Sequence, residues 1–359
     1  GATNVSVGNN SLDANSTGSN NVGIGSHALG GNTTASNNTA VGTDSLKANT
    51  TGADNTGIGK AALTLNTTGD YNVAVGSLAL DANTTGGNNT ALGVLALSAN
   101  TTASNNCAFG FQALINNTTG SGHNTAVGHS AMLDTTDGDT NTAIGASALR
   151  VNQSGDRNTA VGYESLYNSN VDMDGFNVAV GYQAGRASTT GYHNTFLGSE
   201  AGKSNTTGTQ NTAVGPFADD ANTTGSNNVT IGNNARPSTN TVSNQITLGN
   251  SSNDNLRCND TSISSLSDQR DKTEIIDLPN TLKPRKFKWA TRDGNVKDGR
   301  YNAGFIAQEL QSAEASIDYL YLVMNENPER LETKEGNLLP VMVKAIQELS
   351  AKVTALEAG

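Results

Sequence analysis

The sequence is poor in the residues that build large hydrophobic cores. Only 4% of its 359 residues are aromatic and 35% are hydrophobic, whereas 40 are glycine. A conventional globular domain of this length contains more large apolar side chains, so the composition argues against one wide core. Cysteine is also scarce, and because Cys107 and Cys258 lie far apart, a disulfide framework is not expected.

Several further absences narrow the function. No apolar run reaches 18 residues, so no membrane span is predicted. Lys and Arg total 21 against 32 Asp and Glu, and the net charge of −11 disfavours nucleic acid and anionic membranes as partners. The four histidines lack ligand spacing, and we expect neither a metal nor a cofactor. The chain begins with Gly1 and shows no signal peptide, which we interpret as a fragment or a processed product.

The sequence does contain a repeat that covers most of the chain. Motifs of the type Asn-Thr-Ala-Val-Gly end in a glycine that returns every 17 residues, apart from one interval of 18 and one of 19. A constant period indicates stacked structural units, and the register of the apolar positions argues against disorder. The closing glycines are Gly8, Gly25, Gly42, Gly59, Gly76, Gly93, Gly110, Gly128, Gly145, Gly162, Gly181, Gly198, Gly215, Gly232 and Gly249.

Each repeat predicts one short strand and two turns. The residues one and three before the glycine are apolar or β-branched, and the residue between them is usually Ala, which is the period-two pattern of a strand. A second apolar residue, mostly Leu, follows four after the glycine. The asparagine four before the glycine predicts a ladder of side-chain amides that satisfy backbone groups from coil to coil. One repeat cannot bury enough surface alone, but stacked repeats can.

This repeat resembles the left-handed parallel β-roll head of YadA-like trimeric autotransporter adhesins. Their Asn-x-Val-Ala-Ile-Gly unit is similar to Asn-Val-Ala-Val-Gly at 72–76 and at 177–181. The resemblance implies a mainly β fold, a parallel β-roll of 17-residue repeats over 1–250, in a homotrimer.

The composition changes after a Ser/Asn/Asp-rich linker at 251–266. Three blocks, at 267–275, 282–289 and 304–310, resemble in sequence and order the C-terminal intramolecular chaperone of phage endosialidases and tail fibres. The resemblance implies a small α+β chaperone and serine autopeptidase domain at 267–335. It further implies a Ser267/Lys272 dyad and cleavage of the Leu266–Ser267 bond.

The chemistry of this dyad has requirements. A hydroxyl is a weak nucleophile until a base takes its proton, and lysine is a base only when its pKa falls from about 10.4. Arg270 would help to lower it, whereas the neighbouring Asp268 and Asp271 would oppose that. The alternative interpretation is an ordinary helix start, with Ser267 as cap and Lys272 as a solvated charge.

The final segment, 336–359, predicts a helix with an a/d seam of apolar residues. We interpret it as a trimeric coiled coil, the strand number coming from the resemblance, with a helix of the globular domain as the alternative. The seam residues are Leu339, Met342, Ile346, Leu349, Val353 and Leu356.

Many of the scarce aromatic residues and histidines fall at two repeat positions. Tyr71, His123, Phe176 and His193 each stand just before the repeat asparagine. Phe111, His129, Tyr163 and Tyr182 each follow a closing glycine, so stacking would align them in one column. Such a column is a candidate platform for a sugar ring. The alternative is that these side chains pack against a neighbouring chain or shield the roll edges.

Together these features predict a trimeric virion fibre, a phage tail fibre or spike, that attaches to the host surface. Its expected partners are the other two chains, tail or baseplate proteins, and a host-cell glycan or protein receptor. It would be made in the host cytoplasm and displayed on the virion. The only enzymatic activity considered is single-turnover autoproteolysis. The alternatives are a bacterial trimeric surface adhesin and a glycan-degrading tailspike.

Overall fold

The computed structural model describes residues 1–170 and 174–253 and several short segments beyond them. The chain divides into two compact units, Gly1–Asp254 and Asn255–Gly359. The short segments of the second unit are 265–266, 272–277, 285–289, 302–304, 323–324, 332–333, 347 and 349–353.

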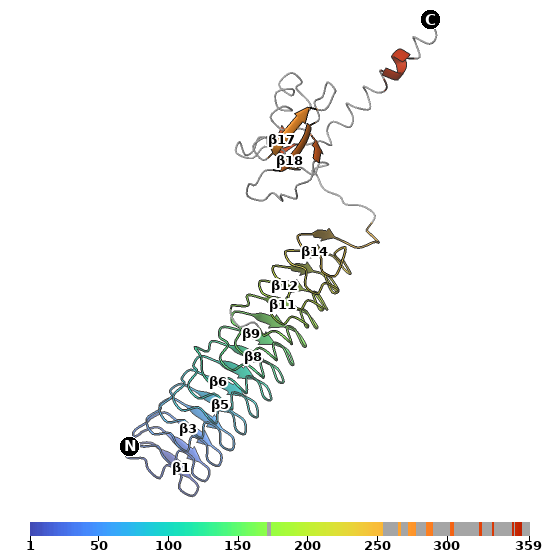
Figure 1. Ribbon diagram of the computed structural model, residues 1–359. Coiled ribbons are helices and arrows are strands. Elements are labelled where there is room, and N and C mark those ends of the chain that lie inside the picture. The colour runs from blue at the N-terminus through green and yellow to red at the C-terminus, as the bar shows by residue number, and fades with distance from the viewer. Residues whose placement is uncertain are drawn as a thin grey trace. The chain divides into compact units, whose positions relative to one another are not determined.

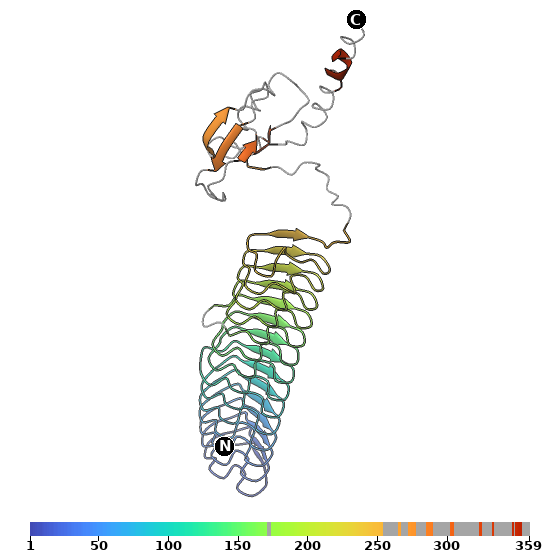
Figure 2. The same ribbon diagram turned by 45° about the vertical axis from the view of Figure 1, so that its right-hand side comes forward.

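The first unit is a parallel β-solenoid with one 15-stranded sheet, which confirms the predicted parallel stacking (Figures 1 and 2). Successive strands pair in register, for example Thr39 with Thr56 and Val73 with Thr90. The strands are β1 (Val5–Val7), β2 (Val22–Ile24), β3 (Thr39–Val41), β4 (Thr56–Ile58), β5 (Val73–Val75), β6 (Thr90–Leu92), β7 (Cys107–Phe109), β8 (Thr125–Val127), β9 (Thr142–Ile144), β10 (Thr159–Val161), β11 (Val178–Val180), β12 (Thr195–Leu197), β13 (Thr212–Val214), β14 (Val229–Ile231) and β15 (Ile246–Leu248).

The core of the solenoid is narrow because the inward residue of most strands is alanine. Ala40, Ala74 and Ala91 are fully buried, and the leucine four residues after most closing glycines reaches the same interior. Leu80 is 0% exposed and has a φ of 53°. A left-handed φ costs a side chain roughly 1–2 kcal/mol, but burial of leucine contributes roughly 1.5–3 kcal/mol. Burial therefore explains why leucine recurs at a strained position.

Two asparagine ladders line the buried turn of the solenoid. In the first, the backbone N–H of Asn38 donates to Oδ1 of Asn21 at 2.9 Å, and Nδ2 of Asn38 donates to the Gly52 carbonyl at 2.9 Å. In the second, Nδ2 of Asn49 donates to Oδ1 of Asn32 at 3.0 Å and to the same Gly52 carbonyl at 2.8 Å. An amide serves because it carries a donor and an acceptor. The predicted ladder is thus confirmed and is doubled.

The closing glycines are required by geometry. Gly93 has a φ of 140°, and a Cβ at this position would lie 2.3 Å from the carbonyl oxygen of Gly110 in the next coil. Both the backbone conformation and the close approach exclude other residues. The invariant glycine therefore sets the spacing between coils.

One place in the core departs from the repeat and compensates for the departure. β12 carries Phe196 where other strands carry a small residue, and its side chain is fully buried. The leucine position is glycine in the coils on either side of this ring, at Gly185 and Gly202. A Cβ on Gly202 would lie 2.3 Å from Cδ1 of Phe196, and one on Gly185 would lie 2.7 Å from its Cδ2. One large ring thus replaces two leucines.

The described part of the second unit contains two antiparallel sheets. Their orders are β16-β21-β20 and β17-β18-β19. The helical residues 347 and 349–353 lie inside the predicted C-terminal helix, whose coiled coil stays a prediction. The strands are β16 (Ser265–Leu266), β17 (Lys272–Asp277), β18 (Arg285–Trp289), β19 (Asn302–Gly304), β20 (Val323–Met324) and β21 (Glu332–Thr333).

Candidate functional site

The outer face of the long sheet is uncharged along the whole solenoid and carries one apolar row beside a row that is rich in threonine. The residue before each closing glycine points outward and is Val, Ile, Leu or Phe in all fifteen strands. Ile58 is 39% exposed, Leu92 44% and Leu197 47%. No strand from β1 to β15 contains a charged residue. Soluble monomers rarely expose a continuous apolar patch beyond a few hundred Å², so this face is a candidate interface.

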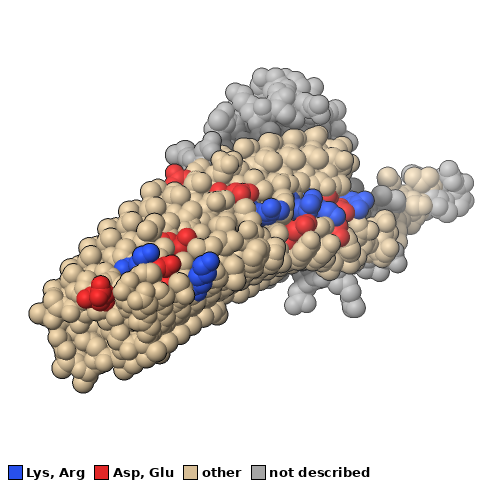
Figure 3. Space-filling view, turned by 90° about the horizontal axis from the view of Figure 1, so that it is seen from below, with Lys and Arg blue, Asp and Glu red and all other residues tan. Residues whose placement is uncertain are grey.

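Charged side chains are concentrated elsewhere on the solenoid. On the face drawn in Figure 3, acidic and basic residues form a band along the long axis with uncharged surface on both sides. Many are paired: Arg186 Nε lies 2.6 Å from a Glu164 oxygen, and Lys203 Nζ lies 2.8 Å from a Glu200 oxygen. These residues stand two and five positions after the closing glycine of their coil. The charged band and the apolar sheet face are therefore different surfaces.

The column of residues that follow the closing glycines contains two stacked aromatic pairs. The rings of Phe111 and His129 lie 5.3 Å apart between centroids, with an interplanar angle of 27°. The rings of Tyr163 and Tyr182 lie 5.6 Å apart and nearly parallel, at 11°. All four side chains are exposed. The predicted column is present, and Ala146 divides it into two pairs.

The stacking follows from a backbone ladder beside the column. The N–H of Ser130 donates to the Phe111 carbonyl at 3.0 Å, that of Ser147 to the His129 carbonyl at 2.9 Å, and that of Glu164 to the Ala146 carbonyl at 3.1 Å. The Ala146 coil is therefore spaced like its neighbours. The column lacks a ring there only because the side chain is small.

A carboxylate lies beside the second aromatic pair. Partial burial alone would raise the pKa of Glu164, but hydrogen bonds from Arg186, Gln183 and Tyr163 outweigh it and lower the pKa. The bond from Arg186 Nε is 2.6 Å long and that from Gln183 Nε2 is 2.8 Å long. The same contact with Glu164 raises the pKa of the Tyr163 hydroxyl. Glu164 is thus an ionised hydrogen-bond acceptor for the Tyr163 hydroxyl and the Arg186 guanidinium.

Two more columns contain ring contacts. The first was not anticipated from the sequence, and the second is the position just before the repeat asparagine. Tyr167 lies between the guanidinium groups of Arg150 and Arg186, at 5.7 Å and 5.4 Å from its ring centroid. In another column, the rings of Phe176 and His193 lie 5.3 Å apart between centroids and are tilted by 48°. The signal was available, because Arg150, Tyr167 and Arg186 all stand five residues after a closing glycine. These contacts brace the coils of β9 to β12.

Of the residues predicted for autocleavage, Leu266 and Lys272 lie within described strands and Ser267 does not. Leu266 ends β16 and pairs with Glu332, whereas Lys272 begins β17 and pairs with Trp289. The two residues therefore belong to different sheets. Ser267 lies outside the described residues, so the dyad and the scissile bond stay predictions.

Other site types have little support in the described ranges. There, no group of three or more His, Cys, Asp or Glu side chains is placed to hold a metal, and no helix is long and apolar enough to span a membrane. Cys107 is a free thiol whose pKa is raised by burial.

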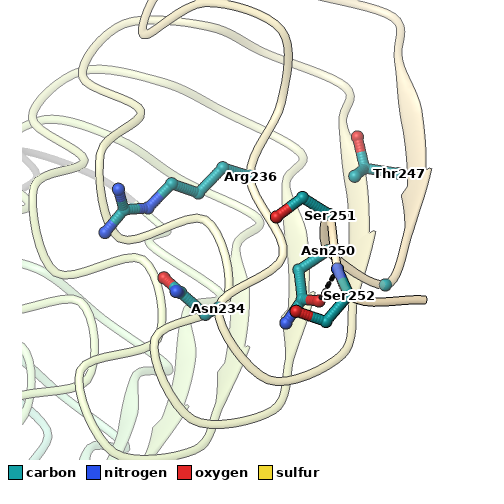
Figure 4. A pocket seen from close by; sticks show the side chains of 7 residues that line it. Asn234, Arg236, Thr247, Asn250, Ser251 and Ser252 are labelled. Atoms are coloured by element: carbon teal, nitrogen blue, oxygen red, sulfur yellow. Dashed lines mark hydrogen bonds between the residues drawn. The ribbon is translucent and has the colours of Figure 1, made fainter.

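An open pocket of about 480 Å³ lies in the last coils and is shown in Figure 4. Three of its lining residues are already bonded. Arg236 pairs with Asp220 at 2.6 Å, the Ser252 N–H donates to Asn250 Oδ1 at 2.8 Å, and Asn250 Nδ2 donates to the Asn233 carbonyl at 2.7 Å. The one charged side chain of the lining, Arg236, is therefore engaged by Asp220.

Comparison with known proteins identifies one region. Residues 267–319 match the peptidase S74 family model, described as the chaperone of endosialidase. The match begins at the predicted first residue of the C-terminal domain and covers only a part of the chain. Comparisons with curated proteins and with solved structures gave no match.

Proposed function

We propose that this protein is a trimeric fibre or tailspike that attaches a virion to its host, with the solenoid as shaft and the C-terminal unit as assembly chaperone. The observation that carries the proposal is the uncharged apolar face of β1–β15 in a chain that also matches the endosialidase chaperone. Such a face has no role in an isolated monomer. An assembly chaperone in the same chain would bring several copies together, and the copies would then pack through this face.

The size of this face suits contact between copies. Fifteen strands at a spacing of ~4.8 Å form a strip roughly 67 Å long, and three residues of strand make it about 10 Å wide. The strip is then on the order of 700 Å² per chain, close to the ~800 Å² that each partner buries in a standard interface. The carboxylates and ammonium groups of the charged band stay in solvent in this arrangement.

A repetitive face also explains why a chaperone is required. The coils present nearly identical apolar rows, so chains displaced by one coil would still bury most of the same surface. Side-chain pattern alone therefore specifies the register weakly. A C-terminal unit that aligns three chains before the shafts associate removes this ambiguity.

Autocleavage would then release the chaperone. In this step neutral Lys272 takes the proton of Ser267 while Oγ attacks the Leu266 carbonyl carbon. The Leu266–Ser267 C–N bond breaks, the proton passes to the leaving nitrogen, and water hydrolyses the resulting ester. The products are a Leu266 carboxylate and a Ser267 amine with its hydroxyl restored. The match of residues 267–319 to the peptidase S74 family supports this step.

The attachment role places the protein on the virion, joined to tail or baseplate proteins and exposed to a cell-surface glycan or protein receptor. The resemblance of the repeats to adhesin heads supports a surface-binding role. An isolated fibre that adsorbs to host cells and blocks virion adsorption would be the direct biological readout.

The assembly proposal is tested by light scattering in a Ser267→Ala background, which keeps the chain whole. We expect a mass near three times the 36.8 kDa chain. Ile58→Lys combined with Ile144→Lys places six ammonium groups in the interface and should shift the mass toward that of one chain. Gln153→Lys, outside the strands of the same solenoid, is the matched control and should stay trimeric. A trimer that survives both sheet substitutions would exclude this face.

The autocleavage proposal is tested by intact mass under denaturing conditions. The unmodified chain should separate into fragments 1–266 and 267–359, and Ser267→Ala should remain at full length. Lys272→Arg, which keeps a charge but removes the base, should also remain whole. If the unmodified chain is not cut, the C-terminal unit is a permanent part of the fibre.

A further inference from the structure

The geometry points to a sugar-binding notch on the side of the solenoid, formed by the rings of His129 and Tyr163 with Ala146 between them. We infer that one neutral hexopyranose ring of a surface polysaccharide inserts into it. This inference rests on the proposed attachment function and assigns that function a place and a ligand class.

The spacing of the column defines the notch. Adjacent rings stack at 5.3 Å and 5.6 Å, and the backbone bonds continue regularly through Ala146. His129 and Tyr163 are two coils apart, or roughly 9.6 Å at ~4.8 Å per coil. A ring inserted midway would lie about 4.8 Å from each neighbour, within the 4.5–7 Å range of stacked rings. The gap therefore accepts a single ring.

The rings beyond the notch hold its walls in place. Phe111 stacks behind His129, and Tyr182 stacks behind Tyr163. Each wall is thus a pair of rings, so inserting a ligand requires little ordering of side chains. The notch is a gap between two supported walls.

The chemistry at the edge of the notch suits sugar hydroxyls. The C–H faces of a pyranose pack on aromatic faces, while its hydroxyls need partners at the rim. The Ser147 hydroxyl follows Ala146 directly, whereas the carboxylate of Glu164 is held by Gln183 and Arg186 of the next coil, on the side away from Ala146. With a net charge of −11 on the chain, a neutral sugar is favoured over an acidic one.

The distribution of the rings argues against a contact with another copy of the chain. The apolar sheet face is continuous from β1 to β15, as contact between parallel copies requires. The column after the glycines instead contains Ser26, Thr43, Lys60 and Ser77 in early coils and rings only after β7, β8, β10 and β11. A local feature of this kind fits a discrete ligand better than a contact that repeats along the shaft.

The test is calorimetric titration of the trimer with dextran, mannan and galactan as neutral probes and polygalacturonate as the acidic one. We expect binding of at least one neutral polymer. Ala146→Tyr, which fills the gap, should weaken that binding tenfold or more, and Tyr163→Ala should weaken it similarly. Ser77→Tyr adds the same ring to the same column away from the notch and should stay within twofold of the unmodified protein.

Each contrary outcome overturns the inference. Binding of none of the neutral polymers, or unchanged binding by Ala146→Tyr, excludes the notch as a sugar site. A change of oligomeric mass in Ala146→Tyr but not in Ser77→Tyr would assign the column to contact between copies. Because trimer mass and cell adsorption are measured separately, the attachment function can stand while the notch fails.

Discussion

The exchange of two leucines for one phenylalanine allows a quantitative test of the core. Phe196→Ala removes a fully buried ring between Gly185 and Gly202, where no side chain can fill the space. Truncation of a buried phenylalanine costs about 3–5 kcal/mol, and the upper half of this range applies where the surroundings cannot collapse. We therefore expect a local loss of about 4–5 kcal/mol.

The loss of stability caused by Gly202→Leu should be relieved by Phe196→Ala. Gly202→Leu alone forces a Cβ to within 2.3 Å of the Phe196 ring and should destabilise the coil. With Phe196→Ala and Gly185→Leu added, the coils regain the alanine and leucine of the other repeats. Two leucines in the left-handed region cost about 2–4 kcal/mol together, but their burial contributes about 3–6 kcal/mol. The triple variant should recover most of the loss.

The assay is hydrogen–deuterium exchange at β11, β12 and β13, because solenoid stability is a sum of local terms. Phe196→Ala should lower protection there while β3 and β4 keep theirs, and the triple variant should restore it. Equal protection in the single and triple variants would refute the idea that one ring substitutes for two leucines. Loss of protection along the whole solenoid would refute the local additivity.

Two further predictions concern buried polar groups. Asp219 occupies the leucine position, and burial raises its pKa from 3.8 to about 6. The folded state therefore holds this proton more tightly, so the free energy of unfolding should fall by roughly 3 kcal/mol as pH rises from 3.8 to 6. Asp219→Asn should abolish this pH dependence of stability, measured as hydrogen exchange at β13 and β14. Asn substitution of the exposed Asp13 should leave it in place. Ser169 interrupts the second asparagine ladder and leaves Oδ1 of Asn152 without a partner in the described structure. Ser169→Asn should supply the missing donor and stabilise the coil by about 1 kcal/mol, read as slower exchange at β10; unchanged exchange there would contradict the ladder as a source of stability.

The solenoid could be predicted from the sequence because each coil repeats the same constraints. The closing glycine, the alternating strand residues and the asparagine fixed the strand positions, and the structure confirms the parallel stacking and the amide ladder. The direction of the two strand faces could not be predicted, since both are apolar. Ala40 points inward and Val41 outward because the leucine of the opposite turn, Leu46, already fills the narrow interior.

The remaining features depend on contacts that a repeat profile hides. Phe196 departs from the repeat pattern of its coil, and the sequence alone does not show that its ring fills the space left at Gly185 and Gly202. The aromatic column was predicted from position, but the single-ring gap at Ala146 required the measured stacking of its neighbours. Ser267 lies outside the described residues, so the dyad still depends on the resemblance and the family match.

The identical bonding of successive coils also bears on how such a chain changes its length. Every coil meets its neighbours through the same carbonyls, amides and glycines, so a whole 17-residue unit can be gained or lost with the junction bonds reproduced. Each event would move the two ends of the solenoid closer or farther by ~4.8 Å. The length of the solenoid can thus change in equal steps through gain or loss of repeats in the gene. A surface feature such as the Ala146 notch can in this way shift along the shaft without any change to its own residues.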